Sequence, residues 1–290
     1  MSVECKVNDI KVRATGLLVI EVVNSNPNGD PDRESDPRQR PDDRGEISPV
    51  SFKRKIRDLV ENKEGPVWKI TAESFDPPLS PEEFCILESR GRDREEIKKE
   101  IRERNFEKKY WDGRIFGNTF LEEEFSKSIK TGVAQFGLGV SIVPILIERL
   151  TTTSKPGVQE GKEQGMAPLS YRIVQHGVYC MPFFINPTAA TKTGCTKRDI
   201  DLLLKMIPYA YSHTASYVRP FVGIRRAWYV EHKSALGSCS DFELIAALTP
   251  KKIIDQEKPS KSWEEYSVPQ KLPDALAGKV DLLRDLMSEI

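Results

Sequence analysis

The chain has 290 residues and carries 44 Lys and Arg against 44 Asp and Glu, so its formal net charge is zero. Its length suffices for one elaborated domain or two small ones, and zero net charge argues against a polybasic protein that holds nucleic acid by bulk charge. The five cysteines are scattered, and three histidines without a C-x-x-C pair disfavour a zinc site, so we expect no disulfide framework, cofactor or metal. No signal peptide or membrane span is visible, which predicts a cytoplasmic protein without a membrane partner.

The first predicted element is a strand. Residues 12–23 are mostly β-branched and aliphatic without helical spacing, which is typical of a buried strand. It ends at residues 24–32, where Asn-Pro, Asn-Gly and Asp-Pro pairs each favour turns. Charged residues then dominate up to Glu46, so we expect a long irregular loop that is functional or mobile.

A helix follows, and the sequence indicates both its start and its faces. Ser48 fits the N-cap and Pro49 the first helical position. Four apolar residues share one face, and four cations, here called the cationic stripe, are expected on the other. The apolar residues are Phe52, Ile56, Leu59 and Val60, and the cationic stripe is Lys53, Arg54, Lys55 and Arg57.

The remaining elements complete a recognisable order. Residues 82–109 are rich in alternating charges and predict a solvated helix that projects from the core as an insertion. Strands are predicted at 133–147, 172–185 and 221–231, a helix at 197–211 opened by a capping box at Thr196, and an irregular excursion at 151–170. The strong elements follow the order βαββαβ, which predicts an α+β fold of the ferredoxin-like or RRM-like kind.

The zero net charge conceals a segregation of charge along the chain. Residues 126–233 hold 14 basic and 6 acidic side chains, a net charge of +8, and the rest of the chain is at −8. A basic core region with an acidic periphery is typical of a protein that follows a phosphate backbone. Ordinary variation in surface charge explains the segregation equally well.

Three features fit nucleic-acid chemistry. The cationic stripe could bind phosphates, with each Arg guanidinium forming two parallel hydrogen bonds and each Lys ammonium contributing a single charge. The alternative is that these residues form a solvated helix face. On the last strand Phe221 shares its parity with Arg219 and Arg225, so its ring could stack a base, although a core position for Phe221 is the favoured interpretation. Met166, isolated in the irregular excursion, could wedge between bases or could be an ordinary surface residue.

Asp30 and Asp32 are the candidate metal ligands. Two carboxylates on a loop supply few of the oxygen ligands that a divalent ion needs. Asp beside Pro or Gly commonly caps a turn, and this is the interpretation that we favour. No catalytic triad can be placed from the sequence. We therefore expect no catalytic residues and no enzymatic activity.

Several motifs together resemble one family. NSNPNGDPD at residues 24–32, followed by SFKRKIRDLV at 51–60, resembles the Cascade backbone subunits of type I CRISPR systems, which belong to the RAMP superfamily. The type I-C subunit looks most similar, and the type I-B relative next. The Asp-x-Arg-x-Phe-Gly pattern at 112–117 agrees, as do residues 176–179, 184–186 and 231–237, in the same order along the chain.

The resemblance implies a hand-shaped fold. The RRM-like palm would comprise residues 1–62, with the first strand, loop and basic helix, together with 116–149 and 173–250. A helical fingers insertion would occupy residues 63–115, and a β-hairpin thumb residues 150–172. Residues 251–290 would form a C-terminal extension.

The resemblance also implies a function in antiviral defence. Copies would polymerise along a CRISPR RNA, the thumb would kink the RNA periodically, and the exposed bases would pair with target DNA. Other partners would be further copies in a helical filament and the guide 5′-end-capping and large subunits of the complex. The expected RNA-binding residues are Asn26, Asn28, Lys53, Arg54, Lys55, Arg57, Gln135, Met166, Arg219 and Arg225.

Two alternatives remain open. The first is a metal-dependent endoribonuclease of the RAMP superfamily that uses Asp30 or Asp32. The second is an oligomeric scaffold that binds no RNA.

Overall fold

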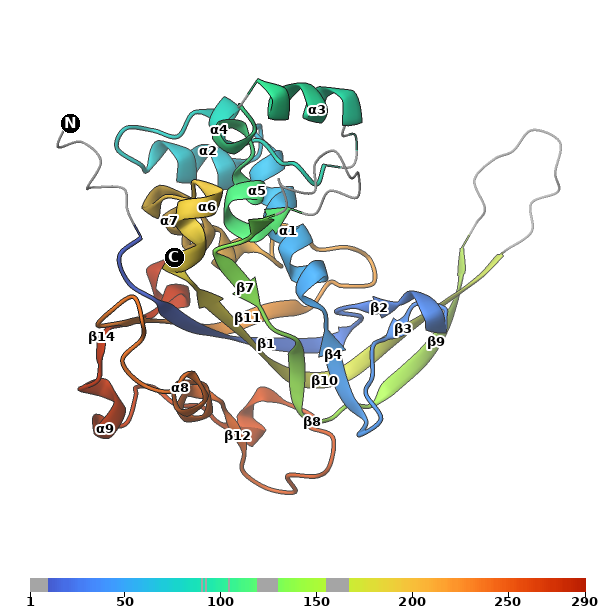
Figure 1. The fold of residues 1–290 in the computed structure, drawn as a ribbon. Helices are drawn as coiled ribbons and strands as arrows, with labels where there is room; N and C mark the ends of the chain where they lie inside the picture. Colours follow the sequence, from blue (N-terminus) through green and yellow to red (C-terminus); the bar gives the residue numbers. More distant parts are fainter. Residues whose placement is uncertain (1–9, 90, 92, 104, 119–129, 155–166) are drawn as a thin grey trace, which may run out of the picture.

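The computed structural model describes residues 10–89, 91, 93–103, 105–118, 130–154 and 167–290. Its centre is an eight-stranded sheet with the spatial order β14-β11-β1-β10-β8-β4, in which β7 and β9 also pair with β10 (Figure 1). Every pair in this sheet is antiparallel. The strands are β1 (Ala14–Ser25), β4 (Arg44–Ile47), β7 (Ala134–Phe136), β8 (Gly139–Pro144), β9 (Ile147–Ser154), β10 (Ala167–Ile185), β11 (Val222–His232) and β14 (Val280–Asp285). The protein is thus a mixed α/β structure built on a large antiparallel sheet.

The central strand β1 is buried on both faces, which explains its uninterrupted apolar sequence. Leu18 and Ile20 belong to the core on one face, whereas Leu17 and Val19 belong to the core on the other. Gly16 is required here because a β-carbon at this position would lie 2.1 Å from the Phe183 ring. The buried strand predicted at 12–23 is confirmed, shifted by two residues.

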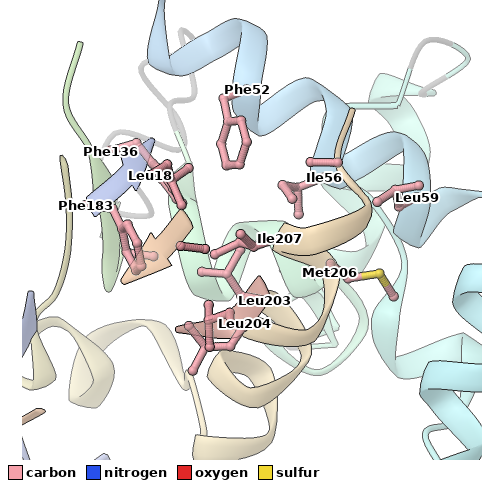
Figure 2. Close-up of a cluster of buried hydrophobic side chains, with 14 of the residues drawn as sticks. Leu18, Phe52, Ile56, Leu59, Phe136, Phe183, Leu203, Leu204, Met206 and Ile207 are labelled. Atoms are coloured by element: carbon pink, nitrogen blue, oxygen red, sulfur yellow. The ribbon is translucent and has the colours of Figure 1, made fainter. Parts of the chain in front are cut away.

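Helices cover one face of the sheet (Figure 1). They are α1 (Pro49–Glu61), α2 (Pro66–Glu73), α5 (Trp111–Phe116), α6 (Pro187–Thr193) and α7 (Lys197–Met206). Figure 2 shows apolar side chains of α1 and α7 meeting side chains of the strands, with Phe52 facing Phe136 and Phe183 of the sheet. The Phe52 and Phe136 ring centroids lie 5.1 Å apart. This contact buries the apolar face predicted for the first helix.

The starts of both main helices are as predicted. Ser48 caps α1 by accepting a hydrogen bond from the Ser51 N–H, and Pro49 is the first helical residue. Thr196 opens α7 with a reciprocal capping box to Asp199. The helix predicted at 197–211 ends earlier, at Met206, and continues as a 3-10 turn over Ile207–Tyr209.

The C-terminal part of the chain covers the other face of the sheet (Figure 1). It contains α8 (Asp241–Leu248), α9 (Asp274–Ala277) and the short pair β12 (Lys251–Lys252) and β13 (Tyr266–Ser267). Leu244, Leu248 and Tyr266 pack there against β1 and β11. The same segment forms a 3-10 turn at Trp263–Glu265, returns as the edge strand β14 beside β11 and ends in a second 3-10 turn at Leu286–Glu289. Residues 251–290 are therefore integral to the core.

The charged insertion lies on the helical side of the molecule. It consists of a 3-10 turn (Pro81–Phe84), α3 (Arg94–Arg102) and α4 (Phe106–Lys109), followed by α5 and a pair of short strands, β5 (Gly117–Asn118) and β6 (Lys130–Thr131). A small apolar cluster of Leu87, Ile97, Phe106 and Tyr110 holds it together. The helix predicted within 82–109 is confirmed as solvated and thinly anchored, but it is broken into two.

Two buried ion pairs tie this insertion to the main helices. The Asp112 carboxylate accepts a hydrogen bond from Arg57 Nε at 2.8 Å and from the N–H of Leu87 at 2.6 Å. Arg114 pairs with Asp199 of the α7 capping box at 2.7 Å. Both pairs are almost fully buried, so they fix where α5 sits against α1 and α7.

Two segments predicted to be irregular contain strands in the residues that the structure describes. Residues 30–46 form a ribbon of β2 (Gly29–Asp30) and β3 (Asp36–Pro37) around a 3-10 turn (Pro31–Arg33), then β4, which pairs with β8. In the 151–170 excursion, β9 extends to Ser154 and β10 begins at Ala167, paired from Ala167↔Ser154 onwards. The strand predicted at 133–147 is divided into β7, β8 and the start of β9. No helix in the described ranges is long and apolar enough to cross a membrane.

Candidate nucleic-acid interface

A polar cleft of about 510 Å³ lies where four segments meet. They are the end of β1, the β2–β3 ribbon, the base of the β9–β10 hairpin and the turn before β11. Figure 1 shows this hairpin projecting away from the sheet, next to the β2–β3 ribbon. The cleft is lined by Asn26, Asn28, Gly29, Pro31, Glu34, Ser35, Tyr171, Arg172, Val218 and Arg219. Three of the predicted RNA-binding residues, Asn26, Asn28 and Arg219, are thus brought together.

The two asparagines shape the floor of the cleft. Asn28 Oδ1 accepts a hydrogen bond from the Ser48 N–H at 2.7 Å, so it joins the turn to the start of α1. Asn26 Nδ2 donates to the Ser35 carbonyl at 2.8 Å, but its buried Oδ1 has no donor among the described residues. An unsatisfied buried acceptor beside a cleft is typical of a site that a ligand or water completes.

Arg219 presents an available guanidinium to the cleft. Its Nε donates to the Asn26 carbonyl at 2.9 Å, which fixes the plane of the group. No carboxylate of the described residues forms an ion pair with it, and its two terminal nitrogens have no partner in the same part of the chain. A fixed and unneutralised guanidinium is suited to forked contact with a phosphate.

Lys55 lies beneath the same region and is the most deeply buried cation of the stripe. Its Nζ donates to Thr214 Oγ1 at 2.9 Å and lies 5.1 Å from the centroid of the Tyr211 ring. Burial, with the nearby Arg219 as a second cause, lowers the pKa of Lys55 to about 8. Within the described residues no carboxylate is at ion-pair distance, so the cation is held by neutral groups only.

Lys53 is a second cation without a carboxylate partner in the described ranges. Its Nζ lies 5.0 Å from the centroid of the Phe116 ring. Burial, then the neighbouring Arg57, lowers the pKa of Lys53 to about 8. Like Lys55, it has no carboxylate at ion-pair distance among the described residues.

The two arginines of the cationic stripe are neutralised within the chain. Arg54 binds Asp58 at 2.6 Å and Glu61 at 2.7 Å, and Arg57 binds the buried Asp112 at 2.8 Å. The expectation of four cations on one open helix face is therefore wrong. Lys55 is on the buried face, and both arginines hold neighbouring structure.

The remaining predicted residues lie elsewhere. Arg225 pairs with Glu21 at 2.8 Å and lies over the Trp263 ring, on the face covered by the C-terminal segment. It occupies the extra position of a bulge in β11, because the pairing steps from Val19↔Arg226 to Ile20↔Ile224. Gln135, in β7, donates to the Gly132 carbonyl at 3.0 Å and does not line the cleft. Met166 lies outside the described residues.

Phe221 is not a core residue. Its side chain is 70% exposed, so the favoured core position is wrong. Tyr217, which sequence reasoning did not select, is 67% exposed and makes an edge contact with Tyr171 at 5.5 Å between ring centroids. The proline and small polar residues around Tyr217 were the available signal that this segment is a turn.

Asp30 caps a turn, as favoured, and Asp32 lies within that turn. Asp30 Oδ1 accepts a hydrogen bond from the Asp32 N–H at 3.2 Å at the start of the 3-10 turn. Among the described residues, no group of three or more His, Cys, Asp or Glu side chains is placed to hold a metal ion.

The histidines of the other motifs are buried in polar networks. His176 contacts Glu21 at 3.2 Å and Ser260 at 2.7 Å, which joins β10 to the C-terminal segment. His232 contacts Thr15 Oγ1 at 3.0 Å and Asp241 at 3.4 Å, which joins β11 to the start of α8. These motif residues hold the fold and do not line the cleft.

Comparison with known proteins places these features in context. A family model described as "CRISPR-associated protein Cas7" matches residues 12–271. A solved structure titled "CRISPR RNA-guided surveillance complex, pre-nicking" has 12% sequence identity and a TM-score of 0.48, covering 75% of this chain and 78% of that one. Another, titled "CRISPR RNA-guided surveillance complex", has 14% identity and a TM-score of 0.45, covering 75% and 68%. No protein with a curated description matches the sequence.

Proposed function

The chain belongs to the CRISPR-associated Cas7 family, and on this premise we propose that it is a backbone subunit that binds CRISPR RNA in a type I Cascade effector complex. The RNA backbone lies in the cleft at the base of the hairpin. The protein holds the guide by its phosphates and shape, and pairing between guide and target supplies the sequence specificity.

One observation carries this proposal: the cleft region holds cations that the chain itself does not neutralise. Among the described residues, neither Lys55 nor Arg219 has a carboxylate at ion-pair distance, although the charge of Asp58 acts on Lys55 from further away. The unsatisfied Asn26 Oδ1 lies beside Arg219. Uncompensated buried charge destabilises a protein on its own. A polyanion in the cleft removes that cost, because each phosphate supplies the missing negative charge.

The parts of the hand follow from the same proposal. The strand order β11-β1-β10-β8, with α1 and α7 on one face, supports an RRM-like palm. The insertion with α2 to α5 supplies the fingers, and the β9–β10 hairpin supplies the thumb that kinks the guide. Further copies of the chain, target DNA and other Cascade subunits are the partners, and the type I-C branch is the proposed subtype.

The experiment that tests the proposal compares two arginines in the full chain. Fluorescence anisotropy with a labelled single-stranded RNA at fixed salt measures the affinity of Arg219→Gln and of the matched control Arg54→Gln. We expect Arg219→Gln to weaken binding about tenfold, because a charge-assisted contact to phosphate is lost. Arg54→Gln should bind as the unmodified protein does, because Asp58 and Glu61 already neutralise this guanidinium. Equal losses in both variants, or none in Arg219→Gln, would contradict the proposed site.

A further inference from the structure

Three aromatic side chains of the described residues are exposed, and two of them flank Arg219. Tyr217 is 67% and Phe221 70% exposed, whereas the third, Phe242, lies in α8 on the other face of the sheet. Large apolar rings in water are unfavourable, so two on either side of an unneutralised arginine need a physical reason. A nucleic acid offers one, since it presents phosphates and flat apolar bases together.

The backbone that carries these rings is firmly held. The Arg219 N–H donates to the Ser216 carbonyl at 2.9 Å, which closes a turn with Tyr217 at its tip. The Asn26 N–H donates to the Val218 carbonyl at 2.7 Å, and the Phe221 N–H donates to Ser25 Oγ at 3.0 Å. Both rings are thus exposed on a rigid segment, and stacking on them costs little conformational entropy.

The contact with Tyr171 places Tyr217 at the mouth of the cleft. Tyr171 itself lines the cleft, and its ring meets Tyr217 in an edge-to-face arrangement with an interplanar angle of 66°. One side of the Tyr217 ring is braced in this way, and the exposed remainder is open to a ligand. The Tyr217 ring therefore extends the wall of the cleft beyond Tyr171.

The open sheet face, on which RRM-type domains stack bases, is closed in this molecule. Trp228 and Val230 of that face are buried under α8 and the C-terminal segment, and Arg225, whose side chain is 45% exposed, lies over the Trp263 ring. Among the described residues, the exposed aromatic rings next to Arg219 therefore lie at the rim of the sheet and not on this face.

We propose that Tyr217 and Phe221 form a stacking surface for unpaired bases of the RNA whose backbone Arg219 holds. The inference rests on the proposed function and adds to it a contact to the bases. A base is favoured over a protein side chain as the occupant because the rings share their segment with Arg219 and the polar cleft, not with a wider apolar patch. Stacking on any base also suits a site that must accept every guide sequence.

The test separates base contacts from phosphate contacts. The full-length double variant Tyr217→Ala/Phe221→Ala is titrated with a labelled single-stranded oligoribonucleotide and with an abasic oligomer of the same length and charge. Phe242→Ala serves as the matched control, because it also removes an exposed aromatic ring. We expect the double variant to bind the ordinary RNA at least tenfold more weakly, with an unchanged salt dependence, and to bind the abasic oligomer as the unmodified protein does.

The possible results have distinct meanings. Because both side chains are exposed, circular dichroism and the unfolding midpoint should be unchanged in the double variant. Equal binding of ordinary RNA by the double variant and the unmodified protein overturns the stacking surface while leaving the proposed function intact. An equal loss on ordinary and abasic oligomers also overturns it, since the rings would then act through the backbone. Failure of the unmodified protein to bind RNA overturns the proposed function as well.

Discussion

Lys55 is the side chain whose surroundings are hardest to account for without a ligand. It is 6% exposed, makes its hydrogen bonds to Thr214 and lies over the Tyr211 ring. Burial is the main cause that lowers its pKa, and Lys53 is affected in the same direction. The protein thus buries two lysines of α1 without ion-pair partners among the described residues, Lys55 near Arg219 and Lys53 beside Phe116.

These lysines predict a pH dependence of RNA binding. Burial brings the pKa of Lys53 and of Lys55 to about 8 in the RNA-free protein, and nearby phosphates favour the charged form. Binding above that pH must therefore take up protons, so affinity falls as pH rises through 8. We expect at least roughly a tenfold loss between pH 7.5 and about 9.5 at constant ionic strength, measured by anisotropy.

The variant Lys53→Met/Lys55→Met provides the control for this prediction. It keeps the apolar volume of the side chains and removes both titrating groups. Its affinity should be lower than that of the unmodified protein at pH 7.5 and nearly independent of pH. A steep pH dependence that survives in the double variant would assign the effect to other groups.

The position of Lys55 on the buried face of α1 was predictable from the sequence. Lys55 follows Phe52 by three residues and precedes Leu59 by four, which is the spacing of the buried face. Reading the four cations as one stripe ignored that spacing. The partners that neutralise Arg54 and Arg57 differ in kind: Asp58 lies one turn away in sequence, whereas Asp112 is brought in only by the tertiary fold.

At the scale of elements, the contact between α1 and α5 depends on Asp112. Its carboxylate is bound by Arg57 and by the N–H groups of Leu87 and Glu88. Asp112→Ala leaves a buried guanidinium and two buried donors unsatisfied, so we expect a loss of about 3 kcal/mol in the free energy of unfolding, measured by urea denaturation. Asp32→Ala, at an exposed position, is the control and should change stability by less than about 0.5 kcal/mol. Similar urea midpoints for Asp112→Ala and Asp32→Ala would contradict this stabilising role of Asp112.

The hairpin can be shortened without disturbing the sheet. Leu150 and Tyr171 are direct partners in the β9–β10 ladder, so an Asn-Gly turn can replace residues 151–170 and close the strands there. We expect the shortened chain to fold and to keep its RNA affinity within a few-fold, because the cleft lies below the cut. Chemical probing of co-expressed guide RNA should show the loss of periodically reactive nucleotides. A periodic pattern that persists would show that the hairpin does not kink the RNA.

The elements that sequence reasoning found are those with strong local signals. The capped helices α1 and α7 and the apolar strand β1 needed no tertiary information. The strand β4, most of β9 and the first residues of β10 were missed because they are charged, or rich in Thr, Gly and Pro, and are held as strands by pairing with a neighbouring strand. The extra residue Arg225 in β11 could not be foreseen, since a bulge is set by the partner strand.

At the scale of the whole molecule, the position of the C-terminal segment bears on the proposed RNA site. By covering the second face of the sheet it leaves the rim near the hairpin as the place where cations, asparagines and aromatic rings gather. The sequence indicated a basic core region of net charge +8 but could not place it on a surface. Only the fold brings residues 26–28, 55 and 217–221 to one site.

The central claim is that single-stranded guide RNA occupies this cleft, and a cryo-EM reconstruction of the chain co-expressed with a CRISPR array tests it most directly. The account predicts RNA density that passes between the β2–β3 ribbon and Arg219, with phosphates near Arg219 and bases against Tyr217 and Phe221. RNA that instead runs over the C-terminal face beside α8, or particles that contain no RNA, would contradict it.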